Sequence, residues 1–587
     1  MRYGRKTDET RGVRIRILIV GLFFSALYLV VAGRVVYLQA FCGDMLAGEA
    51  SREYQKTRVT TGKRGTIYDR NRMEMAVTID TVSVGVHPAA MAGAGKKVDA
   101  LAKALGLKAG DVRRQVASGK SFAWLKRNVS PAEAAAVRQV ELAPGAVAFI
   151  PERQRVYPSK TLAAQVIGFS GIDGNGLEGL EFAYDPFLKG RSARRTIVKD
   201  ARGHDLYTEG GADVADSGGN SLVLTIDGAV QCIVETVLEE TALAHEAASG
   251  MAVVMDPRNG EVLAMANYPL FNPNAFSRYD RRWWRNRAVA DAFEPGSTMK
   301  VFLAAAALEA GVCKPDTAVF CEDGKYRIYT NLIHDTKPHG WLSLAQIVQF
   351  SSNIGAAKVG EMIGRQGLWE ALSRFGFGQE TGVNCAGETR GMLADYGRWT
   401  PIDTAAIAFG QGVSVSAIQL VTALSAVANG GILMKPYVVK AIVDGRGDVI
   451  RLYGAAQGRR VISEKTARTV ANIMETVTSE DGTGTLAAIK GYTVCGKTGT
   501  AQKHNEAGGY TENEFISSFM GFAPKTSPRI AVLVVLDAPR KHHYGGVVAA
   551  PAFRRIAYEV LSYLGVPPDA PDQRDSIMVS IPVEVAG

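Results

Sequence analysis

A serine and a lysine three residues apart, Ser297 and Lys300, are the first candidates for chemistry in this sequence. Pro295-Gly296 interrupts the chain just before them, and an alanine-rich apolar run follows at residues 302–310. This pattern predicts that Ser297 lies at a helix N-terminus with Lys300 on the same helix face. A lysine whose pKa is lowered by burial can accept the serine proton, so Ser297 is a candidate nucleophile and Lys300 its general base.

Ser-x-x-Lys alone is a weak signal, because a chain of this length would contain it about twice by chance. Two further segments follow in order. Ser351-Ser352-Asn353 offers a hydroxyl for proton relay and an amide for a substrate carbonyl, although the segment alone fits an ordinary helix N-cap. Lys497-Thr498-Gly499-Thr500 offers a positive charge and a hydroxyl for a substrate carboxylate, although alone it fits an ordinary β-turn. Its glycine would let the backbone approach a neighbour closely.

The elements around these segments indicate an α+β domain over residues 216–567. Apolar runs at residues 251–255 and 261–265 flank Asn259-Gly260 and predict a hairpin. Leading strands, then helices, then closing strands predict a central antiparallel β-sheet flanked by helices. The predicted closing strands are residues 492–501, 515–522 and 530–536.

The rest of the chain divides into four further parts by composition. A Gly- and Ser-rich stretch at residues 208–220 predicts a linker, so we place a domain boundary there. The parts are a basic cytoplasmic N-terminus (1–16), a transmembrane helix (17–38), an elongated pedestal or dimerisation-like domain (39–215) and a C-terminal tail (568–587).

The apolar span near the N-terminus predicts a membrane anchor. Residues 17–33 carry no charge, and after Arg34 the apolar run continues through residues 35–38. As a helix, about 22 residues would span ~33 Å, which matches a hydrocarbon core. The excess of Arg and Lys before it predicts a cytoplasmic N-terminus, with the remaining chain outside the cytoplasm. A cleaved signal peptide is the alternative, and the length of the run disfavours it.

Composition excludes several other classes of protein. With 47% hydrophobic and 21% charged residues, the chain is not globally disordered. A net charge of +9 without an aromatic-interleaved basic stripe predicts no nucleic-acid partner. The six cysteines match no zinc pattern, so we expect no metal. An oxidising compartment would permit a Cys313–Cys321 disulfide, but the spacing does not decide it.

Together and in this order, S-x-x-K, S-x-N and K-T-G resemble the acyltransferase signature of penicillin-binding proteins and class A β-lactamases. Further strings make the chain similar to the class B penicillin-binding proteins, the peptidoglycan D,D-transpeptidases. The G-K-T-G-T-A-Q string favours the division-type, FtsI-like members, and the elongation type is the alternative. The further strings are Arg64 to Asn71, Leu224 to Asp227, Phe409 to Gly412 and Tyr544 to Gly546.

The resemblance implies a role for each motif residue. Ser297 would be acylated, Lys300 would be the general base, and the backbone N–H groups of Ser297 and Thr500 would form the oxyanion hole. No metal or organic cofactor is implied. The residues expected to relay protons and hold substrate are Ser351, Asn353, Lys497, Thr498, Gly499 and Thr500.

It also implies partners and a location. These are peptidoglycan stem peptides and lipid II-derived glycan strands, β-lactam antibiotics, an FtsW-like glycosyltransferase with other division proteins, and the bacterial inner membrane with a periplasmic catalytic domain. Arg64 and Asp69 would form either an internal ion pair or a partner contact. Two rival functions are less favoured: a β-lactamase, since no motif identifies its extra glutamate, and a β-lactam sensor, since only one membrane span is predicted.

Overall fold

The computed structural model describes most of the chain and forms two compact units. One unit comprises residues 1–62 and 191–217, and the other comprises residues 63–190 and 218–587. This division into compact units does not test the predicted domain boundaries, which stay predictions. The predicted C-terminal tail lies almost wholly outside the described residues. Those described are 6–199, 205–209, 218–454, 457–504 and 509–570.

The first unit contains a long N-terminal helix, α1 (Lys6–Ala40). Among the described residues, its segment Arg11–Ala40 is the one helix long and apolar enough to cross a membrane. Helix α2 (Gly43–Tyr54) follows and leads into an antiparallel sheet of order β1-β6-β7. The strands are β1 (Gln55–Thr61), β6 (Ser192–Lys199) and β7 (Asp205–Glu209).

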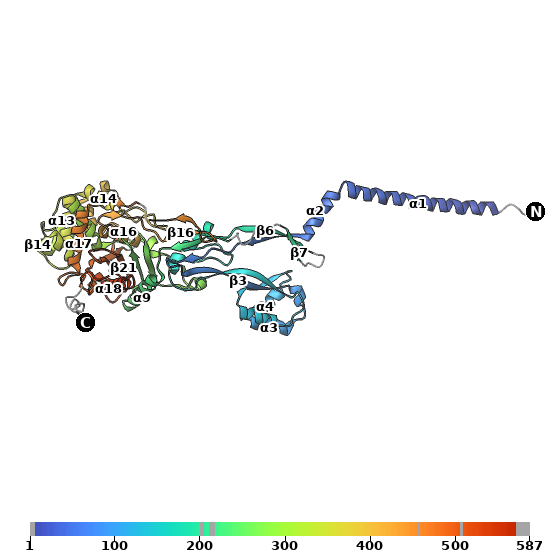
Figure 1. The fold of residues 1–587 in the computed structure, drawn as a ribbon, viewed down its shortest axis with the longest axis horizontal. Coiled ribbons are helices and arrows are strands. Elements are labelled where there is room, and N and C mark those ends of the chain that lie inside the picture. The colour runs from blue at the N-terminus through green and yellow to red at the C-terminus, as the bar shows by residue number, and fades with distance from the viewer. Residues whose placement is uncertain (1–5, 200–204, 210–217, 455–456, 505–508, 571–587) are drawn as a thin grey trace, which may run out of the picture. The chain divides into compact units, whose positions relative to one another are not determined.

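The second unit is built around a five-stranded antiparallel sheet of order β10-β9-β21-β20-β19. Figure 1 labels its central strand, β21. Its strands β9 and β10 pair antiparallel and confirm the predicted hairpin. The strands predicted at the end of the catalytic region are present as well. The strands are β9 (Ser249–Met255), β10 (Val262–Tyr268), β19 (Cys495–His504), β20 (Tyr510–Ala523) and β21 (Ile530–Asp537).

Both faces of this sheet are covered. Successive side chains of a strand point to opposite faces, so successive residues are apolar and not only every second one. In β9, Val254 belongs to the core beneath α9 (Gly228–Ala244) and α18 (Gly545–Tyr563). Val253 points the other way, into the core shared with α16 (Ala417–Ala428). The sheet is therefore a rigid central layer, and β19 lies at its edge.

Several helices lie in the sequence between β10 and β19, with short strands among them. Helix α11 (Met299–Glu309) is buried along residues 299–307 and packs against α13 and α17. The other helices in this stretch are α10 (Arg287–Ala290), α12 (Leu344–Gln349), α13 (Asn353–Ile363), α14 (Arg365–Arg374), α15 (Pro401–Ala408) and α17 (Glu464–Thr478).

A second, mixed sheet has the order β17-β16-β8-β2-β3-β4, with β5 also paired to β3. It joins strands far apart in sequence, since β2 pairs parallel with β8 and β8 pairs antiparallel with β16. Its strands are β2 (Ile67–Tyr68), β3 (Glu74–Val86), β4 (Ala123–Val129), β5 (Val147–Val156), β8 (Ser221–Leu224), β16 (Val439–Val443) and β17 (Val449–Leu452).

Small elements complete the second unit. Helices α3, α4 and α5 enclose a separate apolar core against β3 and β4. Four strands of three or four residues form two antiparallel pairs near α13, β11 with β14 and β12 with β13, and a further short pair, β15 with β18, follows α16. The elements are α3 (Gly95–Ala104), α4 (Ala109–Val116), α5 (Pro131–Arg138), α6 (Ala164–Ile167), α7 (Gly179–Ala183), α8 (Asp185–Leu188), β11 (Ala318–Phe320), β12 (Lys325–Ile328), β13 (Asn331–His334), β14 (Trp341–Ser343), β15 (Ile432–Leu433) and β18 (Arg459–Arg460).

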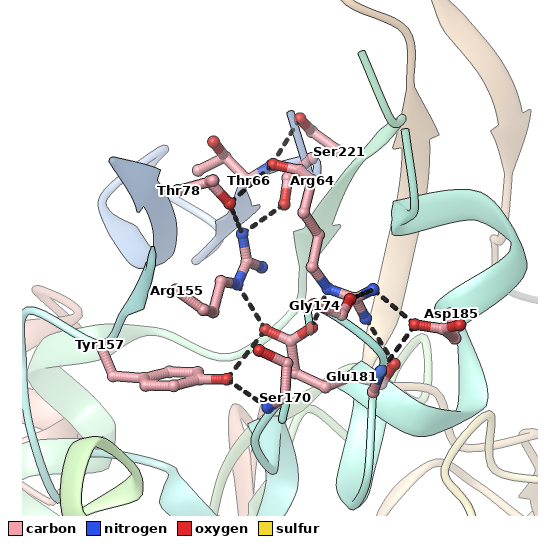
Figure 2. Close-up of polar contacts among 12 residues, drawn as sticks. Arg64, Thr66, Thr78, Arg155, Tyr157, Ser170, Gly174, Glu181, Asp185 and Ser221 are labelled. Carbon is pink, nitrogen blue, oxygen red and sulfur yellow. Dashed lines mark hydrogen bonds and ion pairs between the residues drawn. The ribbon is translucent and has the colours of Figure 1, made fainter. Parts of the chain in front are cut away.

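Arg64 lies in a buried polar cluster within the second unit (Figure 2). Its guanidinium binds the Glu181 carboxylate at 2.6 Å and the Asp185 carboxylate at 2.5 Å. Arg155 binds the other Glu181 oxygen at 2.7 Å, and the Tyr157 hydroxyl donates to that same oxygen. Glu181 and Asp185 thus compensate the charges of the two guanidinium groups, as burial of a charge requires.

An internal ion pair between Arg64 and Asp69, one of the two alternatives, does not form, because Arg64 pairs with Glu181 and Asp185. Asp69 instead accepts hydrogen bonds from the backbone N–H groups of Asn71 (2.8 Å), Met73 (2.7 Å) and Gly228 (3.1 Å). A carboxylate that satisfies three backbone donors stabilises a turn rather than a neighbouring charge. Both residues therefore have internal roles, with partners that sequence spacing did not indicate.

Candidate active site

Ser297 lies in a single 3₁₀ turn, Gly296–Thr298, that leads directly into α11. This confirms the predicted position at a helix N-terminus. Gly296 adopts φ +54°, a left-handed conformation that glycine tolerates, and its N–H donates to the Gly410 carbonyl at 3.0 Å. The turn is thus fixed from outside the helix, and the serine is held at its start.

Lys300 is fully buried beneath Ser297. Its Nζ donates to Ser297 Oγ at 3.1 Å, to Asn353 Oδ1 at 2.7 Å and to the Ser351 carbonyl at 2.6 Å. Burial lowers the pKa of Lys300 to about 7, opposed in part by the charge of the Asp335 carboxylate. Near neutral pH, a substantial fraction of this amine is uncharged and able to accept the serine proton.

The Ser351-Ser352-Asn353 segment turns sharply before α13. Ser351 adopts φ +63°, and its Oγ lies 3.3 Å from Lys300 Nζ. The N-cap of α13 is Ser352, whose Oγ accepts from the Gly355 N–H at 2.9 Å. Asn353 is therefore the first residue of the helix and not its cap, and its amide is free to bond Lys300.

Lys497 is the third motif residue brought into this cluster, from β19. Its Nζ is buried and donates to Ser351 Oγ at 3.0 Å and to the Thr498 carbonyl at 3.1 Å. Burial, and then the neighbouring charge of Lys300, lowers the pKa of Lys497. The Ser351 hydroxyl accepts hydrogen bonds from both lysines, so it connects the general-base candidate to the carboxylate-binding candidate.

The surroundings of Gly499 explain why the third motif has a residue without a side chain at this position. A Cβ at this position would lie 2.2 Å from Ser518 Oγ on β20 and 2.9 Å from Thr298 Cγ2. Next to it, Thr500 Oγ1 accepts from the Gly545 N–H at 3.0 Å, which ties β19 to the start of α18. The strand can therefore run directly beside the Ser297 turn.

The structure brings all three motifs into one site. In the part of the chain that the structure describes, neither lysine Nζ lies within ion-pair distance of a carboxylate. An incoming substrate carboxylate would meet this cationic, largely desolvated cluster, where electrostatic attraction is strong. The outer edge of β19 has no strand partner in this sheet, and an unpaired edge is the kind of surface to which an extended peptide can add.

Metal or disulfide chemistry has no visible support in the described residues. No group of three or more His, Cys, Asp or Glu side chains is placed there to hold a metal ion. Cys313 and Cys321 are both free and buried, so the permitted disulfide is not formed.

Asp335 is the site residue that sequence analysis missed. Its carboxylate accepts from the Asn353 N–H at 2.5 Å, directly beside the Lys300 contact. It follows β13 in a short polar loop and belongs to no recognisable string of residues. Only the fold places it against a segment that begins sixteen residues later in the chain.

Two family models match the chain in order. The model described as Penicillin-binding Protein dimerisation domain matches residues 59–224, and the Penicillin binding protein transpeptidase domain matches residues 250–558. The second match alone covers more than half of the chain and contains every predicted site residue. The chain belongs to the class B penicillin-binding proteins.

Curated relatives extend the similarity over almost the whole length. Peptidoglycan D,D-transpeptidase FtsI of Escherichia coli K12 is 34% identical, over 92% of this chain and 90% of that protein. Stage V sporulation protein D of Bacillus subtilis is 35% identical, over 95% of this chain and 87% of that protein. The probable peptidoglycan D,D-transpeptidase PenA of Neisseria meningitidis is 34% identical, over 95% and 94%.

Solved structures share the fold. Penicillin binding protein 3 of Mycobacterium tuberculosis, complexed with aztreonam, aligns with a TM-score of 0.68 and 27% identity, covering 88% of this chain and 99% of that chain. A peptidoglycan synthetase from Bifidobacterium adolescentis aligns with a TM-score of 0.69 and 26% identity, covering 88% and 98%. The predicted α+β architecture is thereby confirmed.

Proposed function

We propose that this chain is a serine-type peptidoglycan D,D-transpeptidase that cross-links stem peptides during septal wall synthesis. The observation that carries the proposal is the 3.1 Å contact between Ser297 Oγ and the buried Lys300 Nζ, beside Lys497. This is the arrangement of a nucleophile with its base next to a site for a carboxylate.

The first step forms an acyl-enzyme. Neutral Lys300 accepts the Ser297 proton as Oγ attacks the carbonyl of the D-Ala–D-Ala peptide bond. The backbone N–H groups of Ser297 and Thr500 stabilise the oxyanion. When the C–N bond breaks, the leaving amine takes a proton that Lys300 returns through Ser351, whose Oγ contacts both lysines.

The second step transfers the acyl group. A neighbouring stem-peptide amine gives a proton to Lys300 and attacks the ester, which releases Ser297 with its own proton restored. Asn353 donates to a substrate amide carbonyl, and Lys497 with Thr498 and Thr500 binds the terminal carboxylate. A β-lactam carries the same carboxylate and strained amide, so it acylates the same serine.

The septal assignment rests on the similarity to the FtsI of E. coli. In this proposal α1 crosses the bacterial inner membrane once, with its basic N-terminus in the cytoplasm and the catalytic domain in the periplasm. Residues 39–215 form the pedestal that positions residues 216–567 near the wall. An FtsW-like glycosyltransferase supplies lipid II-derived strands, and other division proteins bind nearby.

Labelling with a fluorescent penicillin tests the nucleophile. Ser297→Ala should abolish covalent labelling, whereas Ser277→Ala, which changes an exposed serine outside the site, should label like the unaltered protein. Persistent labelling of the Ser297 variant would refute the assignment. Rapid turnover of a chromogenic β-lactam would instead favour a β-lactamase.

Depletion in cells tests the septal role separately. Loss of a septal enzyme should give filaments, whereas round cells would indicate the elongation role.

A further inference from the structure

We propose that Asp335 is a positioning residue for the transpeptidase reaction. It holds the Ser351-Ser352-Asn353 segment in its working conformation, and it places a negative charge near Lys300. The proposal rests on the proposed function of the same site. Its basis is a set of contacts that link one carboxylate to the Ser352 hydroxyl and to the backbone N–H groups of Asn353 and Ile354.

Asp335 satisfies three donors at the start of α13. Oδ1 accepts from the backbone N–H groups of Asn353 at 2.5 Å and Ile354 at 3.1 Å. Oδ2 accepts from the hydroxyl of Ser352, the N-cap, at 2.5 Å. These groups lack partners inside the helix, and a negative charge at a helix N-terminus is electrostatically favoured.

The loop that carries Asp335 also holds the Asn353 side chain. The Asn353 Nδ2 group donates to the His334 carbonyl at 3.1 Å, which leaves Oδ1 directed at Lys300. The backbone and amide of Asn353 are thus fixed by adjacent residues of one loop. Farther along the same loop, His339 stacks on Phe350, so the loop contacts both ends of the segment.

This support matters because Ser351 adopts φ +63°, in the left-handed region that a serine rarely adopts. Such a conformation persists only where the surrounding structure imposes it. Ser351 is the residue whose Oγ contacts both Lys300 and Lys497. Contacts that fix the residues following it therefore fix the proton-relay geometry.

Asp335 also acts electrostatically. Asp335 is the charged group that shifts the pKa of Lys300, and Lys300 in turn shifts the pKa of Lys497. The Asp335 carboxylate raises the pKa of Lys300 against the effect of burial. Removing this charge should therefore move the titration of Lys300 to lower pH, an effect that loss of packing alone would not produce.

Asp335→Asn tests both roles, because it retains the shape and removes the charge. The rate constant for acylation by a β-lactam should fall on the order of 100-fold, since small displacements of catalytic groups have large effects. The midpoint of its pH dependence should move below that of the unaltered protein. Asp323→Asn is the matched control: this exposed aspartate lies just before β12, and both the rate and the midpoint should be unchanged.

Asp335→Glu separates the two roles. It keeps the charge but displaces it, so the pH midpoint should stay while the rate falls. All rates are to be expressed per titrated active site, so that unfolded protein does not contribute. An unchanged rate in Asp335→Asn, or a lower rate with an unmoved midpoint, would overturn the proposal. Labelling of Ser297 in the unaltered protein tests the proposed function independently of either result.

Discussion

Lys300 obtains its basicity from its surroundings. An exposed lysine is protonated at neutral pH, but Lys300 is fully buried in an apolar helix and contacts the oxygens of Ser297 and Asn353. Desolvation penalises its charged form, and the charge of the Asp335 carboxylate opposes only part of this effect. The side chain thus becomes a base without any histidine at the site.

The pH dependence of acylation follows directly. Since the pKa of Lys300 is lowered to about 7, its protonated and inactive form should dominate at lower pH. The acylation rate should fall about tenfold per pH unit below that value and level off above it. Stopped-flow acylation measured between about pH 5 and 10 checks this. A midpoint close to that of a free lysine would contradict the proposed role of burial.

At this scale the sequence predicted which side chains meet but not how they are held. Spacing and order predicted the Ser297, Lys300 and Lys497 cluster, because each residue lies in a distinctive string. The Ser351-Ser352-Asn353 segment also fitted a helix N-cap, and the structure shows that its middle residue, Ser352, caps α13. The role of Asp335 was not predictable from the sequence, because its contacts depend on how a short loop folds back onto α13.

At the scale of elements, β19 and the Ser297 turn approach each other through Gly499. Gly499→Ala places a Cβ against Ser518 Oγ and Thr298 Cγ2, and overpacking of this kind costs about 1–3 kcal/mol of stability. The acylation rate should fall on the order of 100-fold, since β19 moves relative to Ser297. Adding Ser518→Ala removes the closest contact and should restore part of the rate. Full activity in the single variant, or no recovery in the double variant, would contradict this account.

The buried cluster around Glu181 joins segments that lie far apart in the sequence. Glu181→Ala would leave the guanidinium groups of Arg64 and Arg155 without their shared partner, which should cost about 3–5 kcal/mol of unfolding free energy. Urea denaturation of the second unit measures this. Asp173→Ala is the control: that carboxylate is 72% exposed and pairs with Arg127, so its loss should cost under about 1 kcal/mol. Equal losses of unfolding free energy in the Glu181→Ala and Asp173→Ala variants would contradict the importance of burial.

Element types were predictable where the pattern was strongly periodic or bounded by Gly and Pro. The β9–β10 hairpin and α11 are of this kind. The mixed sheet was not predictable, because β2 has two residues and pairs with β8 across more than 150 positions of sequence. Pairing between strands so far apart in the sequence depends on tertiary packing, which local sequence patterns do not reveal.

At the scale of the whole molecule, the first prediction concerns the anchor. Side chains of α1 such as Leu22 and Phe23 are more than 60% exposed in the protein alone, so water would contact a continuous apolar surface. Removing residues 1–40 should move the protein from the detergent-dependent to the soluble fraction while penicillin labelling remains. Ultracentrifugation with and without detergent checks this, and a truncated chain that still sediments with membranes would contradict it.

The cationic cluster has one more consequence, for the supply of donor strands. Lys300 and Lys497 are buried side by side, and among the described residues neither Nζ lies within ion-pair distance of a carboxylate, so the site favours a peptide that ends there with a free acid. A strand whose terminal acid is masked as an amide would be a poor donor even though the catalyst is intact. Enzymes that edit those ends would thereby control how densely the wall is linked.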